Sequence, residues 1–119
     1  MKRSDELIDL SREHHSALRL ARQLERGERV PDLDRQLDTL LTHFAEEERR
    51  FADVLDTTPG DRALYTRLKR EHADLEQALR QAVRGLGLAR AGELLAAHVR
   101  FEERELFERI EALGALVEI

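Results

Sequence analysis

The sequence contains no cysteine, which excludes disulfide bonds, thiolate metal sites and cysteine nucleophiles. It has two prolines and six glycines in 119 residues, too few turn-forming residues for a domain of many short strands. Aromatic residues make up 4%, which argues against a surface that stacks on nucleic-acid bases. No apolar run approaches the roughly 20 residues of a membrane-spanning helix, and the first ten residues lack the apolar segment of a signal peptide. We therefore expect a cytoplasmic location and neither a nucleic-acid nor a membrane partner.

Charge and length indicate one soluble domain. Charged and hydrophobic residues account for 38% and 41%, which leaves enough apolar material for a core. The formal net charge is −5, so a basic face for phosphate groups is not indicated. We expect a single domain over residues 1–119, because the length is typical of one domain and no segment resembles a linker.

Apolar residues recur every three to four positions along most of the chain, which is the pattern of amphipathic helices. The pattern is interrupted by turn-forming residues at Gly27, Pro59-Gly60 and Gly85–Gly87. Ser4 and Asp32 are suited to cap the helices that follow them. Four helices of about 20 residues joined by short loops pack most simply as an antiparallel up-down-up-down bundle, an all-α fold. The expected helices cover roughly residues 4–26, 32–56, 61–84 and 89–113.

The two halves of the chain resemble each other. The string HFAEEERRF begins at His43, and HVRFEERELF begins at His98. Earlier in each half, SREHHSAL (residues 11–18) matches KREHADL (residues 69–75). The repeat predicts two helical hairpins of one plan, related by an approximate two-fold axis.

Four of the five histidines fall one per predicted helix, at His14, His43, His72 and His98. At roughly 100° per residue, each lies on or beside the apolar stripe of its helix, whereas His15 lies about 100° from His14, towards the edge. A glutamate follows two of them by four residues and so shares their helix face: Glu47 after His43, and Glu102 after His98. The pattern therefore predicts four imidazoles and two carboxylates that point into one bundle core at a similar height.

Such a cluster favours a cation, because a buried carboxylate is costly unless it is paired or binds a metal. Nitrogen and oxygen donors without sulfur suit iron, manganese or zinc. Six donors exceed what one tetrahedral zinc needs. Two ions would use all of them if each took two histidines and shared both glutamates.

The order of these elements resembles the hemerythrin-like, or HHE cation-binding, domain. The resemblance rests on a histidine in the first helix, H-x-x-x-E-E in the second, E-H in the third and H-x-x-x-E-E in the fourth, and it covers about residues 7–113. It implies a four-helix bundle that holds two iron ions with an oxo or hydroxo bridge. Manganese and zinc are the alternatives. The ligands it implies are His14 (with His15 as the alternative), His43, Glu47, His72, His98 and Glu102.

The sequence departs from the family's oxygen carriers in the third helix. Those proteins place two histidines there, four residues apart, but Leu68 lies four residues before His72. The missing ligand argues against reversible oxygen carriage and favours reactivity or sensing, with Glu76 as a candidate substitute ligand. In the carriers the fourth-helix carboxylate lies five residues after its histidine, which would be Glu103, but Glu102 is preferred because Glu103 points about 100° away.

The neighbouring side chains have several interpretations. Glu48 and Glu103 are expected to bond to the ligands or to arginines, with direct ligation as the alternative. Tyr65 is expected to pack in the core, and the alternative is that Tyr65 and Leu68 line a small-molecule pocket. The family resemblance implies binding or sensing of oxygen, nitric oxide or peroxide. The alternatives are a small di-iron oxidase or peroxidase, less favoured because the chain has little material for a substrate pocket, and a metal-free structural bundle.

Overall fold

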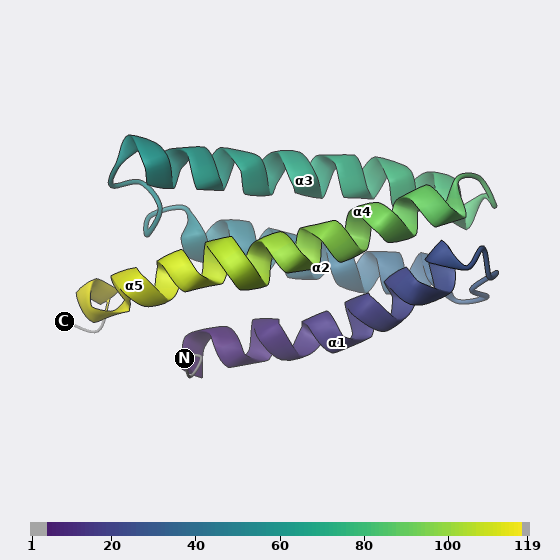
Figure 1. The fold of residues 1–119 in the computed structure, drawn as a ribbon, viewed down its shortest axis with the longest axis horizontal. Coiled ribbons are helices and arrows are strands. Elements are labelled where there is room, and N and C mark those ends of the chain that lie inside the picture. Colours follow the sequence, from purple (N-terminus) through teal and green to yellow (C-terminus); the bar gives the residue numbers. More distant parts are fainter. Residues whose placement is uncertain (1–4, 118–119) are drawn as a thin grey trace.

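The computed structural model describes residues 5–117 and contains helices but no strand in that range. Helices run alternately up and down side by side, so the predicted four-helix bundle is confirmed (Figure 1). The fourth helical rod is continuous but is divided by a short π-helical segment, η1, between α4 and α5. No helix in the described range is long and apolar enough to cross a membrane. The elements are α1 (Asp5–Glu25), α2 (Leu33–Phe51), α3 (Pro59–Val83), α4 (Leu88–Phe101), η1 (Glu102–Leu106) and α5 (Phe107–Val117).

The helix ends follow local chemistry, with three corrections to the predicted bounds. The fourth helical rod continues to Val117 and does not end near residue 113, because Gly114 keeps a negative φ and does not break the helix. α3 begins at Pro59 and not near residue 61, because the Thr58 hydroxyl accepts a hydrogen bond from the Asp61 backbone N–H and Pro59 needs no such partner. α2 ends at Phe51 and not near residue 56, because the chain turns there and buries Leu55 completely.

The two predicted caps have different outcomes. Asp32 precedes α2 as expected, but its carboxylate accepts from the Gln36 side chain at 2.9 Å and caps no backbone N–H. The predicted cap Ser4 lies outside the described residues.

The core consists of two hydrophobic clusters with a polar layer between them. In each helical rod, one cluster lies mainly before the inward histidine and the other mainly after it. Phe44 and Val99, which directly follow a histidine, belong to the cluster that precedes it. The first cluster includes Leu20, Leu24, Leu37, Phe44, Leu75, Leu79 and Leu95. The second includes Leu7, Leu10, Phe51, Leu55, Leu68, Phe101, Leu106 and Phe107.

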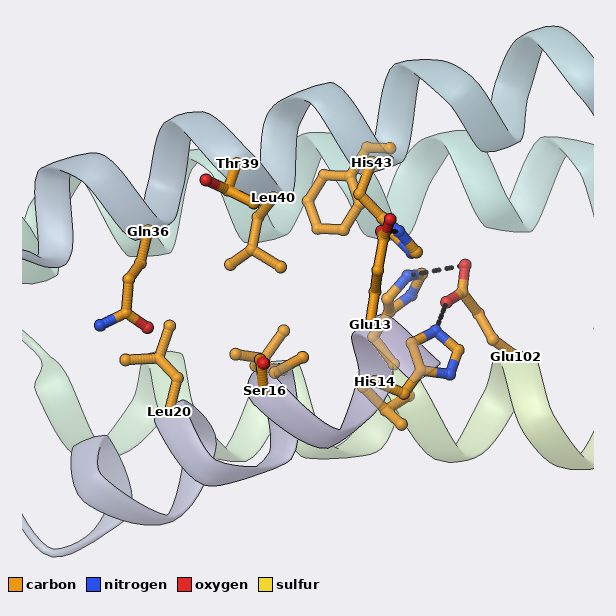
Figure 2. Close-up of a pocket in the computed structure, with 14 residues that line it drawn as sticks. Glu13, His14, Ser16, Leu20, Gln36, Thr39, Leu40, His43 and Glu102 are labelled. Carbon is orange, nitrogen blue, oxygen red and sulfur yellow. Dashed lines mark hydrogen bonds and ion pairs between the residues drawn. The ribbon is translucent and has the colours of Figure 1, made fainter. Parts of the chain in front are cut away.

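The bundle is packed unevenly around its axis. α1 packs closely on α4, where a Cβ atom on Gly92 would lie 2.6 Å from the carbonyl oxygen of Ala21 and 2.7 Å from the backbone nitrogen of Glu25. α1 and α2 contact each other much less. A cavity of about 320 Å³ lies between these two helices (Figure 2). At the opposite end of the bundle, α5 is linked to the start of α3. Arg109 of α5 donates two hydrogen bonds to the carboxylate of Asp61, at 2.7 and 3.1 Å.

Candidate metal centre

The polar layer brings together the six groups that the helical wheel places inside. The four histidines are at most 6% exposed, and the two glutamates are fully buried. They come from all four helical rods: His14 from α1, His43 and Glu47 from α2, His72 from α3, and His98 and Glu102 from α4 and the start of η1.

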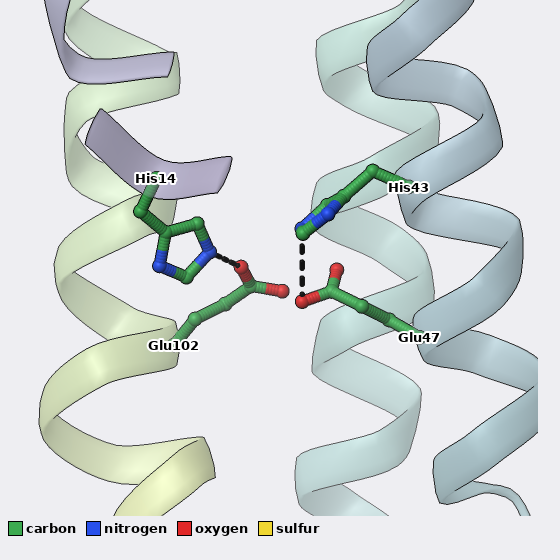
Figure 3. Close-up of side chains that lie close together, drawn as sticks. All are labelled: His14, His43, Glu47 and Glu102. Atoms are coloured by element: carbon green, nitrogen blue, oxygen red, sulfur yellow. Dashed lines mark hydrogen bonds and ion pairs between the residues drawn. The ribbon is translucent and has the colours of Figure 1, made fainter. Parts of the chain in front are cut away.

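The six side chains form two overlapping clusters. One consists of His14, His43, Glu47 and Glu102 (Figure 3), and the other of His72, His98 and the same two glutamates. In each cluster, one nitrogen or oxygen atom from every member lies within 4.8 Å of those of the others. Because both glutamates belong to both clusters, the arrangement offers two adjacent cation sites bridged by two carboxylates.

The four Nε2 atoms face the two carboxylates in a two-fold pattern. Between hairpins, Nε2 of His14 lies 2.6 Å from Oε1 of Glu102, and Nε2 of His72 lies 3.1 Å from Oε1 of Glu47. Along a single helix, Nε2 of His43 and Nε2 of His98 each lie 3.2 Å from Oε2 of the glutamate four residues later. The internal repeat seen in the sequence is thus present in the geometry of the centre.

A second carboxylate bonds each histidine from the outside. Nδ1 of His14 lies 2.7 Å from Glu103, and Nδ1 of His72 lies 2.7 Å from Glu48. A neutral imidazole that donates its Nδ1–H to a carboxylate directs the Nε2 lone pair inwards, and metal-ligating histidines are held in this way. Nδ1 of His98 likewise lies 2.6 Å from Glu71, and Nδ1 of His43 is bonded to Glu13.

These outer contacts obey one rule in both halves. The second glutamate of each EE pair crosses to the other hairpin: Glu48 to His72, and Glu103 to His14. The glutamate that precedes the first histidine of each hairpin reaches the second histidine of the same hairpin, as Glu13 and Glu71 do. Glu13 and Glu71 were not predicted as partners of the histidines, although the EH dipeptide that contains each of them occurs in both halves.

The donors fit cations because four of them lack a well-directed hydrogen bond and face each other only across ion-pair contacts of 3.2 Å. Four buried side-chain atoms in the described range make no hydrogen bond: Nε2 of His43, Nε2 of His98, Oε2 of Glu47 and Oε2 of Glu102. Leaving such groups unsatisfied costs roughly 1–3 kcal/mol each. One nitrogen and one oxygen belong to each half of the centre, so a cation bound in each half would satisfy all four.

The electrostatics of the layer also suit added positive charge. Burial alone would lower the pKa of His43, but the carboxylates of Glu102 and Glu47 raise it to about 11. In the same way Glu102 and Glu71 outweigh the effect of burial on His98 and raise its pKa to about 9. Burial and the negative charge of Glu102 raise the pKa of Glu47. Metal ions would replace the protons that the imidazoles otherwise hold against these carboxylates.

The other candidates lie outside the two clusters. His15 is exposed on α1. Glu76 is not a member of either cluster and pairs with Arg80 at 2.7 Å on the outer face of α3. Tyr65 donates a hydrogen bond to the backbone carbonyl of Glu48, and Leu68 is fully buried in the second hydrophobic cluster. Neither Tyr65 nor Leu68 lines the α1–α2 cavity, because both face the end of the bundle opposite to it.

The π-helical segment begins at the bridging residue Glu102. The backbone N–H of Phe107 donates to the carbonyl of Glu102, five residues earlier, where a regular α-helix would use four. This wider turn accommodates the one residue by which HVRFEERELF exceeds HFAEEERRF. It brings Phe107 onto the ring of His14, with centroids 5.4 Å apart in a stacked arrangement.

Comparison with known proteins agrees with this geometry. The chain matches the sequence model of the hemerythrin HHE cation binding domain over residues 5–110. No curated protein and no solved structure matched the chain. The resemblance inferred from the histidine and glutamate pattern is thereby confirmed. The chain belongs to the hemerythrin HHE cation-binding domain family.

Proposed function

We propose that this protein holds two iron ions and uses them to bind or sense oxygen, nitric oxide or peroxide, in an iron-sensing, oxygen-sensing or oxidative-stress role. The observation that carries the proposal is the pair of clusters that share Glu47 and Glu102. Imidazole and carboxylate donors without sulfur suit iron, with manganese and zinc as alternatives. Bound iron would supply redox chemistry and open coordination positions.

The protein's own residues define how open the centre is. Each cluster offers two imidazoles and one oxygen from each bridging carboxylate. At position 68, where the oxygen carriers have another histidine, Leu68 is fully buried in the apolar core and offers no donor. The ion beside His72 and His98 therefore lacks that ligand, which supports sensing or reactivity over oxygen carriage.

Elemental analysis of protein purified without chelator tests the proposal. We expect about two irons per chain and a near-ultraviolet absorption of an oxo bridge that azide changes. Glu102→Gln should lower the content of both ions together, because Glu102 belongs to both clusters. The matched control is His15→Gln, an exposed neighbour of His14 that should keep both. Metal-free protein that does not take up ferrous iron would contradict the proposal.

A second candidate function is that of a small di-iron oxidase or peroxidase. The observation that favours it is the cavity between α1 and α2, which is lined by His14, His43 and Glu102 of the centre. Repeated turnover of peroxide with a reducing dye, lost in His98→Ala, would support the enzyme. A single stoichiometric reaction would support the sensor.

A further inference from the structure

The α1–α2 cavity extends well beyond the metal centre. At one end it is lined by His14, His43 and Glu102, and from there it continues to Gln36 and Leu20 (Figure 2). Gln36 precedes His43 by seven residues, which is about 10 Å along a helix. The volume of about 320 Å³ lies within the range of pockets for organic ligands. For comparison, an engineered apolar cavity of about 150 Å³ binds benzene.

A break in the two-fold repeat contributes to this space. Phe44 follows His43, and its ring stacks on His72 of the next helix with centroids 4.1 Å apart. The equivalent position after His98 is Val99, which lines the cavity. Val99 carries no ring, and the ring that stacks on His14 is that of Phe107, which does not line the cavity. The cavity wall of this half therefore keeps space that a phenylalanine at position 99 would occupy.

The lining indicates the chemistry of an occupant. Its walls are apolar, and they include Leu20, Leu40 and Val99. Polar groups lie at the rim, where Gln36 of α2 extends towards α1 (Figure 2) and the hydroxyl of Thr39 donates to the carbonyl of Arg35. No lysine or arginine is among the described residues that line it. The histidines that line it, His14, His43 and His98, are each already bonded to a carboxylate, so an organic anion would meet no unpaired counter-charge.

We propose that the α1–α2 cavity binds a neutral organic molecule with an apolar body and one hydrogen-bonding group, beside the ion site of His14 and His43. The apolar body lies against Leu20, Leu40 and Val99, and the polar group meets Gln36 or Thr39. The position of this ligand next to an ion rests on the proposed function, but its binding to the cavity does not.

Titration calorimetry with 2-naphthol, a neutral two-ring compound with one hydroxyl, tests the proposal on iron-loaded and metal-free protein. We expect saturable binding of one molecule per chain. Val99→Phe supplies the missing ring and should weaken binding by about tenfold or more, since it removes the apolar space. The matched control is Val83→Phe, the same change at an exposed position outside the cavity, and it should leave the affinity unchanged.

A second variant keeps the test valid if Val99→Phe does not fold. Ala17→Leu adds bulk to the cavity from α1 and should weaken binding in the same way. Absence of saturable binding to the unmodified protein would overturn the proposal, as would binding that neither variant weakens. Protein that binds iron but not 2-naphthol would refute only the cavity ligand, and protein that binds 2-naphthol but no metal would refute only the di-iron function.

Discussion

Phe51 and Phe107 meet edge to face in the core, with ring centroids 6.0 Å apart. They are equivalent members of the repeat, yet Phe51 follows its bridging glutamate by four residues and Phe107 follows by five. The π-helical turn absorbs the difference, so both rings reach the same layer below the metal centre.

Deletion of Arg104 should therefore be tolerated. This exposed residue lies inside η1, and its removal would give the fourth rod the spacing that α2 already has. A regular α-helix could then carry Leu106 and Phe107 at their present positions. We expect a cooperative thermal transition close to that of the intact protein, measured by circular dichroism.

The matched control is deletion of Arg49, an exposed residue of α2. α2 is a regular α-helix without a π turn, so the deletion would shift the residues that follow by one position. Phe51 would rotate by about 100° away from the core. Loss of one buried phenylalanine costs about 1.5–3 kcal/mol in transfer free energy alone. Equal destabilisation by the two deletions would show that the π turn does not absorb an extra residue.

The outer carboxylates should control metal affinity without being ligands. Glu13 bonds Nδ1 of His43, and Glu13→Gln would weaken the hold on that imidazole. Changes of this kind typically lower metal affinity by about 10–100-fold. Competition with a coloured chelator measures the effect. Glu46→Gln is the control, since Glu46 pairs with the exposed Arg49 and Arg50 and does not contact the centre in the part of the chain that the structure describes. Equal affinities for the two variants would refute the role of Glu13.

The inward histidines could be predicted from sequence because periodicity alone defines which face of a helix is apolar. His14 and His72 lie at the centre of their stripes, and Glu47 and Glu102 follow a histidine by one turn. Contacts between side chains of different helices could not be predicted in this way, because periodicity does not define how the helices are placed. Glu13 and Glu71 lie beside the stripe and look like solvated side chains until the neighbouring helix is placed.

Two further features depended on information that a helical wheel lacks. The π turn was not predicted, although the two repeated strings differ in length by one residue, and its effect depends on how Phe107 packs. The cavity depends on the separation of α1 and α2, which periodicity does not define. For this reason the space available for an organic molecule is larger than the sequence predicted.

The ion pair of Asp61 and Arg109 should make stability depend on pH in the acid range. The guanidinium of Arg109 and the hydroxyl of Thr57 lower the pKa of Asp61 from 3.8 to about 2. Because the folded pKa lies below the unfolded one, the stabilisation is complete above about pH 4 and is lost as the pH falls towards 2. Asp61→Asn should therefore lower the free energy of unfolding by about 1–2 kcal/mol at pH 7.

The difference between Asp61→Asn and the unmodified protein should narrow below pH 4. Urea unfolding of both proteins across this range measures it, and any loss of metal in acid is common to the two. A difference that stays constant down to pH 2.5 would exclude the carboxylate charge as its source.

Gly92 should be essential for the contact between α1 and α4. A Cβ atom there would overlap the backbone of Ala21 and Glu25, which cannot move as a flexible side chain could. We expect Gly92→Ala to destabilise the protein by about 1–3 kcal/mol in denaturant unfolding. Gly114→Ala is the control, since a Cβ atom there meets nothing within 4 Å and should add about 1 kcal/mol of helix propensity. Stabilisation by both changes would contradict the close approach.

The sharing of Glu102 by both clusters has a consequence for the order of assembly. A ribosome delivers α1, α2 and α3 before the segment that contains His98 and Glu102. Until that segment emerges and packs, neither cluster has all four members, and the outer partner of His14, Glu103, is also missing. A nascent chain with three helices would hold His14, His43 and Glu47 but would lack the shared Glu102, so neither cation site would be complete. Selective capture of a metal becomes one of the last steps of folding.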